Sequence, residues 1–170
     1  PLPPNSPLRT LVPGETITTK DYRRDEVQQM IGDICAYRNG HGCFFPALCW
    51  KHSIIEGCRK GDVRKSGATK MWKLLGGLVF PYPGEILLTR DGEEIPTYDE
   101  LMYGLVRGRS GVVAQYTARI NLPWRAEFSV AVLDDSINIE KIREIINAGG
   151  LYAGVGAWVN GGFGRYILTS

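Results

Sequence analysis

The clearest pattern along the chain is an alternation of apolar and polar positions in two stretches, residues 112–120 and 124–132. Successive side chains of a strand point to opposite faces, so a period of two predicts a strand with one buried face. Only Asn121-Leu122-Pro123 separates the two stretches, which favours antiparallel pairing between them. We therefore expect two adjacent strands that share one apolar face.

A helical period follows these strands. Isoleucines recur at helical spacing over residues 139–146, and Gly149-Gly150 is a candidate stop signal. A glycine-rich segment over 154–164 then leads into a short predicted strand at 165–168. This order predicts an α+β fold with a ferredoxin-like or RRM-like antiparallel sheet, helices on one face and a glycine-rich C-terminal loop. The predicted core consists of Trp124, Phe128, Val130, Ile142, Ile145 and Ile146.

The first half of the chain contains weaker signals. Residues 25–32 are compatible with a short helical turn, and Asn39-Gly40-His41-Gly42 predicts a hairpin turn between residues 34–38 and 43–45. Apolar residues at helical spacing over 47–60 predict a helix that ends at Gly61.

Prolines mark two further segments. Pro81 and Pro83 interrupt an apolar run over 78–89, which confines that predicted strand to a sheet edge or a bulge. The first seven residues contain four prolines, and residues 1–20 are predicted to form an extended arm. Residues 21–170 are predicted to form a single α+β domain.

Composition adds little about partners. Of the 170 residues 44% are hydrophobic and 22% charged, as is typical of a globular domain, and the net charge is only +2. No apolar run approaches the ~18–20 residues that span a bilayer, and the start does not resemble a signal peptide. We therefore expect a cytoplasmic protein that does not associate with membranes, in the host cytoplasm if it is viral.

The four cysteines lie close together in the sequence, at Cys35, Cys43, Cys49 and Cys58. They contain no CxxC pair, and their spacing fits no standard closed zinc site. We interpret them as buried thiols in a reducing compartment and expect neither a metal nor another cofactor.

Positive charge is concentrated between residues 59 and 73. This basic stretch contains one acidic residue, Asp62, against six cations: Arg59, Lys60, Arg64, Lys65, Lys70 and Lys73. Such clustering on a nearly neutral chain is a candidate contact surface for phosphates.

The glycine-rich segment is the second candidate. Five glycines between residues 154 and 164 would let the backbone expose N–H groups to a ligand, and Arg165 follows them. Trp158 and Phe163 would offer stacking surfaces for unpaired bases. The alternative is a surface loop that closes the sheet, with both aromatic side chains tucked into the core. The segment is neither a Walker A loop nor a dinucleotide fingerprint, because no GK[ST] follows it and a helix precedes it.

Gly162-Phe163-Gly164-Arg165 resembles the C-terminal motif of the repeat-associated mysterious protein (RAMP) superfamily, the RRM-like subunits of CRISPR effector complexes. A second similarity lies at Pro46 to Lys51, where that family has a proline, small residues and a basic residue that opens a helix. The chain departs from the family at His52, where the family has glycine, and at Ile55, where it has arginine. The resemblance covers about half of the chain and implies an RNA-binding RRM-like subunit, or a relative from a phage or mobile element.

Catalytic candidates are few. Some RAMP relatives cleave RNA with a histidine, but His41 falls in a predicted turn and His52 lies one helical turn from Glu56, as in a surface contact. Asp134-Asp135 and Glu93-Glu94 are typical of a helix cap and a turn. We therefore predict no catalytic residue.

Three hypotheses follow. The first is a single-stranded nucleic-acid-binding subunit, for RNA or DNA, that acts as a homo-oligomer or within a larger complex. The second is a structural or assembly protein, viral or otherwise, whose arm binds neighbouring subunits, and the third is a metal-independent endoribonuclease. The first hypothesis assigns nucleic-acid contacts to Lys51, Arg59, Lys60, Arg64, Lys65, Lys70, Trp158, Asn160, Gly161, Gly162, Phe163, Gly164 and Arg165.

Overall fold

The computed structural model of the chain describes residues 25–66, 69–108, 111–157 and 162–169. The predicted fold class is confirmed: these residues form a mixed α+β structure with four α-helices and antiparallel sheets, which is compatible with a ferredoxin-like arrangement. The chain divides into two compact units, residues 1–43 with 89–124 and residues 44–88 with 125–170. The predicted arm lies outside the described residues, so the division into an arm and a single domain stays a prediction.

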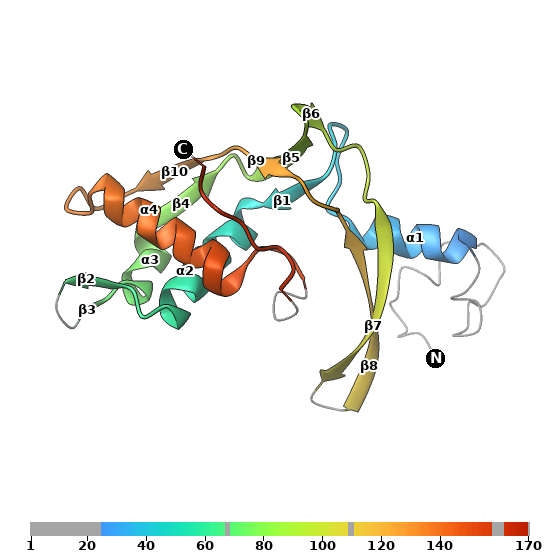
Figure 1. Cartoon of the computed structure of the whole chain (residues 1–170), viewed down its shortest axis with the longest axis horizontal. Coiled ribbons are helices and arrows are strands. Elements are labelled where there is room, and N and C mark those ends of the chain that lie inside the picture. Colours follow the sequence, from blue (N-terminus) through green and yellow to red (C-terminus); the bar gives the residue numbers. More distant parts are fainter. Residues whose placement is uncertain (1–24, 67–68, 109–110, 158–161, 170) are drawn as a thin grey trace. The chain divides into compact units, whose positions relative to one another are not determined.

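The first unit is built on a long two-stranded ribbon with a helix packed against it (Figure 1). Nine residues of each strand pair antiparallel, from Glu100 with Arg119 to Gly108 with Gly111. The helix buries Val27 and Ile31, four residues apart on one face. The elements of this unit are α1 (Asp25–Cys35), β6 (Glu93–Glu94), β7 (Glu100–Gly108) and β8 (Gly111–Arg119).

The second unit contains most of the secondary structure and a continuous core. Side chains from three helices pack in one cluster, and several of them are at most 1% exposed. These include Ile54, Leu75 and Ile145, and also Met71, which comes directly before the helix that contains Leu75. Its elements are β1 (Phe44–Pro46), α2 (Ala47–Lys60), β2 (Arg64–Ser66), β3 (Thr69–Lys70), α3 (Trp72–Leu78), β4 (Val79–Tyr82), β5 (Glu85–Arg90), β9 (Arg125–Ala126), β10 (Ser129–Val132), α4 (Ile139–Ala148) and the π-helix η3 (Gly149–Ala153).

Helix α2 agrees with its predicted bounds, and Gly61 is its C-cap. Helix α4 was also predicted, and Asn138 caps it by accepting a 2.9 Å hydrogen bond from the Lys141 N–H. The α-helix ends at Ala148 with Gly149 as its C-cap, as the glycine pair predicts. The chain then continues as the π-helix η3, which was not predicted, and turns at Gly154, where φ is +86°. Glycines 149 and 150 have another role, described below.

The predicted pairing of residues 112–120 with 124–132 is wrong. Strand β8 pairs with β7, whereas β10 is short and pairs with β4. An alternating pattern determines which face of a strand is buried but leaves its partner open. The apolar run over 78–89 is likewise two strands, since β4 pairs with β10 and β5 pairs with β1. Pro81 lies in the two-stranded β4–β10 sheet, whose strands are both edges, as the proline predicts.

Three smaller predictions need correction. Residues 34 and 35 end α1, so the predicted hairpin is reduced to a single bridge between Arg38 and Cys43. Residues 165–168 form no strand. Of the predicted core, Ile145 and Ile146 are buried with Val130 and Ile142 packed against them, but Phe128 stacks on Trp50 and Trp124 belongs to the first unit.

Candidate functional site

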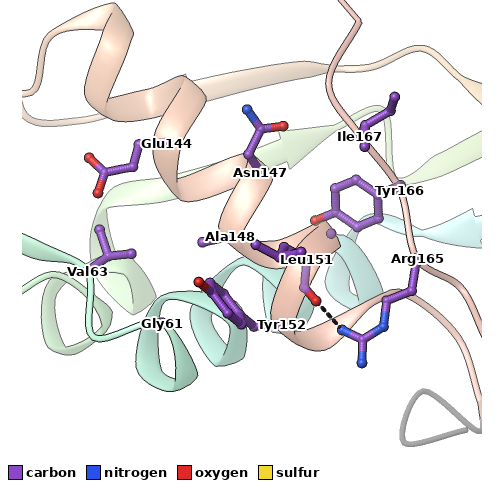
Figure 2. A pocket seen from close by; sticks show the side chains of 11 residues that line it. Gly61, Val63, Glu144, Asn147, Ala148, Leu151, Tyr152, Arg165, Tyr166 and Ile167 are labelled. Carbon is purple, nitrogen blue, oxygen red and sulfur yellow. Dashed lines mark hydrogen bonds between the residues drawn. The ribbon is translucent and has the colours of Figure 1, made fainter. Parts of the chain in front are cut away.

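An open cleft of about 860 Å³ lies in the second unit (Figure 2). Three segments that are distant in the sequence form it: the turn after α2, the end of α4 with η3, and the chain after the glycine-rich segment. The lining residues are Gly61, Val63, Glu144, Asn147, Ala148, Gly150, Leu151, Tyr152, Arg165, Tyr166 and Ile167.

The longest wall of the cleft is one face of a helix. Four lining residues lie along one stripe of this helix, because they follow one another at helical spacing. The stripe begins at Glu144 and continues three, four and seven residues later with Asn147, Ala148 and Leu151. The stripe stays continuous because Gly149 keeps helical angles, φ −55° and ψ −53°, where α4 passes into η3. Wider turns of this kind are frequent at functional sites.

Tyr152 comes next on this wall and is 43% exposed. Its ring lies against Gly61, where an added Cβ would come within 2.6 Å of the ring atom Cε2. Gly61 therefore ends α2 and also makes room for an aromatic ring in the cleft.

The opposite wall is the C-terminal segment, which is tied to the helix by polar contacts. The Arg165 Nη1 donates to the Leu151 carbonyl oxygen over 2.8 Å, and the Leu168 N–H donates to the Asn147 Oδ1 over 3.1 Å. These bonds fix the guanidinium of Arg165 at the end of the cleft near Leu151 (Figure 2).

Several glycines are explained by this close packing. A Cβ on Gly150 would lie 1.9 Å from the Tyr166 carbonyl oxygen, and one on Gly164 would lie 1.8 Å from the Val155 carbonyl oxygen. Val155 in turn donates its N–H to the Gly164 carbonyl oxygen over 2.9 Å. The glycines at these positions therefore let backbone segments meet.

Behind the cleft, Tyr166 joins a buried aromatic and polar cluster. Its hydroxyl lies 3.1 Å from the Ser53 Oγ, and its ring centroid lies 5.1 Å from that of Trp50. Burial raises the pKa of Tyr166 to about 12, and burial likewise raises the pKa of the nearby Cys58 thiol to about 12. Both groups are therefore protonated and neutral at physiological pH.

These pKa values predict a loss of stability in alkali. In the unfolded chain the Cys58 thiol and the Tyr166 hydroxyl would lose their protons near their ordinary pKa values of 9.0 and 10.0, well before the folded chain does. Stability is therefore complete below about pH 9 and falls as pH rises towards 12, by about 1.4 kcal/mol per unit of pKa difference at most. Urea unfolding between pH 8 and pH 11 measures this fall.

The control for this effect is Tyr166→Phe, which keeps the ring and removes the titrating hydroxyl. We expect its stability to fall less steeply between pH 10 and pH 11 than that of the wild type. Tyr82→Phe, at a residue that is 53% exposed, should leave the profile unchanged. Equal slopes for Tyr166→Phe and the wild type would contradict the prediction.

The basic stretch adjoins the cleft through Gly61 and Val63, but most of its described cations already have acidic partners. Arg59 contacts Glu56 over 2.7 Å, and Asp62 accepts from both Arg64 and Lys70 over 2.7 and 3.1 Å. These two cations lower the pKa of Asp62. All three pairs are solvent-exposed, and such pairs contribute about 0–1 kcal/mol, so a phosphate could replace the carboxylate at little cost.

The remaining predicted contacts have different environments. Lys51 donates to the Gly76 carbonyl oxygen over 2.7 Å and lies 3.9 Å above the centroid of the Phe80 ring, so it holds α2 against α3 and β4. Lys60 is exposed, Gly162 is exposed with a φ of +87°, and Phe163 is partly buried. Trp158, Asn160 and Gly161 lie outside the described residues, as does the side chain of Lys65.

The titratable groups considered for catalysis lie elsewhere. His41 and His52 are exposed. Asp134 accepts two bonds from Ser136 in the turn before α4, but the cap of that helix is Asn138 instead of the predicted Asp134-Asp135. In the described part of the chain, no group of three or more His, Cys, Asp or Glu side chains could hold a metal ion. All four cysteines are described and none forms a disulfide; Cys43 and Cys58 are buried, but Cys35 is exposed.

Sequence reasoning found Arg165 and the basic stretch but missed Glu144, Asn147 and Tyr152. The signal was present: two polar residues, three positions apart, lie beside the isoleucine stripe of α4. The apolar period of the helix does not by itself distinguish polar residues that line a cleft from polar residues that face solvent.

No helix within the described ranges is long and apolar enough to cross a membrane. Comparison of the chain with protein-family models, with curated proteins and with solved structures found no match.

Proposed function

We propose that this chain binds single-stranded nucleic acid, RNA or DNA, as a subunit of a larger assembly. One observation carries the proposal. The same cleft is lined by Gly61 and Val63, which lie within the basic stretch, and by Arg165, which ends the glycine-rich motif. The sequence marks these two segments separately. The RAMP resemblance of Gly162-Phe163-Gly164-Arg165 points to the same class of ligand.

The groups around the cleft suit a sugar-phosphate strand with unstacked bases. The planar guanidinium of Arg165 can contact phosphate oxygens through two N–H groups at once. The half-exposed ring of Tyr152 can stack on a base, which is worth about 1–3 kcal/mol per base. Lys60 and Arg64 are exposed and flank the lining residues Gly61 and Val63 in the sequence, where they would attract the strand.

The affinity for single strands should therefore fall as the salt concentration rises, and substitutions of the contacting cations should make this fall less steep. Each phosphate contact contributes a slope of about −0.7 to the log–log plot of affinity against salt for a single strand. We expect the double variant Lys60→Ala, Arg64→Ala to flatten this slope by roughly 1.4, and Arg165→Ala to flatten it by roughly 0.7. Fluorescence anisotropy with labelled homopolymers between 50 and 200 mM salt measures the slopes.

Arg143→Ala provides the matched control, because Arg143 is an exposed cation on α4 that does not line the cleft. Its slope should equal that of the wild type. Tyr152→Ala should lower affinity with little change of slope, since stacking releases no counterions. If wild-type protein retained no homopolymer at ~50 mM salt, the proposal would fail and the assembly hypothesis would replace it.

A specific observation favours that second candidate. In the part of the chain that the structure describes, the sheet β7–β8 has two strands, so each long strand has an outer edge without a strand partner there. Protein edges of this kind are usually covered or used for association. An assembly role is compatible with nucleic-acid binding, since subunits can associate along a strand.

A further inference from the structure

We infer that the cleft selects a guanine base, with Glu144 accepting hydrogen bonds from its Watson–Crick edge. This inference rests on the proposed function and names the base that the same cleft would take. Three groups of the cleft carry it: an acid and an aromatic ring on the helical wall, and a cation on the C-terminal segment opposite.

The cleft has unlike charges at its two ends. Glu144 and Leu151 are seven residues apart on the continuous helix, a distance of ~10 Å along its axis. Arg165 is bonded to the Leu151 carbonyl oxygen, so its guanidinium marks the far end of that span. Figure 2 shows Tyr152 in the stretch between Glu144 and Arg165. One nucleotide covers a comparable length from its phosphate to the outer edge of its base.

The acid determines which end takes the phosphate. An ionised carboxylate has only acceptors, so Glu144 would repel a phosphate and instead requires N–H donors. The phosphate is therefore assigned to Arg165 and the base edge to Glu144. The side chains between them, including Val63, Ala148 and Leu151, are apolar and suit the flat faces of a base and sugar.

Among the four bases, guanine fits a carboxylate best. Its Watson–Crick edge presents a ring N–H and an amino group side by side, so both carboxylate oxygens can accept at once. Adenine and cytosine have a single amino group beside a ring nitrogen that would repel the second oxygen. Uracil and thymine have one N–H between two carbonyl oxygens, which is less favourable still.

The carboxylate of Glu144 can be redirected at low cost. It is paired with Lys141 one turn earlier on the helix, and its side chain is 49% exposed. Exposed pairs of this type contribute little to stability. A base edge can therefore replace the Lys141 ammonium group, or bind the Glu144 carboxylate together with it. Asn147, by contrast, uses its oxygen to hold the Leu168 N–H and thereby positions the opposite wall.

The test compares a labelled oligouridine with the same oligomer carrying one guanosine, adenosine or cytidine. Anisotropy titrations at low salt should show the wild type binding the guanosine oligomer about tenfold more tightly than the other three. Glu144→Gln, which replaces one acceptor with a donor, should reduce that ratio to about one.

Two variants on the same helix separate base recognition from other effects. Glu140→Gln removes an exposed acid of α4 that does not line the cleft, and it should keep the guanosine preference. Lys141→Gln breaks the ion pair of Glu144 without removing the carboxylate, so it should also keep the preference. Loss of the preference in Lys141→Gln would assign it to the ion pair and overturn the inference.

The outcomes distinguish this inference from the proposed function. Equal, salt-dependent binding of all four oligomers by the wild type would overturn guanine selection and leave strand binding supported. A preference that survives Glu144→Gln would also overturn it. If no oligomer were bound at low salt, the proposed function itself would fail.

Discussion

Replacing Trp50 with alanine is expected to lower the free energy of unfolding of the second unit by about 3–5 kcal/mol. Trp50 is 2% exposed, and its ring is surrounded by aromatic side chains. The ring centroids of Phe128, Tyr166 and Phe45 lie 4.7, 5.1 and 6.4 Å from that of Trp50. Alanine would remove the largest buried side chain of this cluster and leave a cavity among the three rings that contact it.

Urea unfolding followed by circular dichroism measures this loss. Leu48→Ala is the matched control, because Leu48 lies two residues earlier on α2 but is 60% exposed, so its removal should change stability by at most about 0.5 kcal/mol. Trp50→Phe, which keeps an aromatic ring, should fall between the two. A loss below about 1 kcal/mol for Trp50→Ala would show that the cluster contributes little to the fold.

The aromatic cluster also shows what the sequence could reveal. The helical period around Trp50 predicted α2 with its correct bounds and pointed to Trp50 as an inward residue. It could not name the partners, because Phe128 and Tyr166 come from segments far along the chain and follow no local rule. Periodicity is a property of one element, whereas packing partners depend on how elements are brought together.

The strand pairing was predicted wrongly for a related reason. Most of the alternating residues 112–120 form β8. Its partner β7 shows no clean alternation, and it has one glycine in its interior, Gly104, and one at its end, Gly108. The neighbouring alternating stretch was predicted as the partner, although Pro123 has no N–H for a ladder. That stretch is divided between β9, which pairs with β5, and β10, which pairs with β4. Sequence proximity was therefore a poor guide to register.

The candidate site was predictable in part. Arg165 stood out because it follows a dense run of glycines, and the basic stretch stood out by charge. Their common cleft could not be predicted, because it depends on the π-helix η3, which continues the chain after α4 ends at Ala148. Gly149-Gly150 was interpreted only as a stop signal, but the small size of both glycines also serves close packing against the C-terminal segment.

Gly150→Ala tests this interpretation and should lower the free energy of unfolding by about 3 kcal/mol or more. Its added Cβ would lie 1.9 Å from the carbonyl oxygen and 2.8 Å from the carbonyl carbon of Tyr166. Both are backbone atoms, so no side-chain rotation relieves the contact, and either η3 or the C-terminal segment must move. A shift of the segment would displace Arg165, so strand binding should weaken together with stability.

Two other glycines separate this steric effect from backbone conformation. Gly77 lies in α3 with nothing within 4 Å of an added Cβ, so Gly77→Ala should stabilise the protein by up to about 1 kcal/mol through helix propensity. Gly162 is equally open but has a φ of +87°, so Gly162→Ala should cost only the left-handed strain of about 1–2 kcal/mol. Thermal unfolding of the three variants should therefore rank Gly77→Ala above Gly162→Ala and Gly162→Ala above Gly150→Ala. If Gly150→Ala proved as stable as Gly77→Ala, the C-terminal segment could not lie against η3 as closely as the structure places it, and the cleft would lose its second wall.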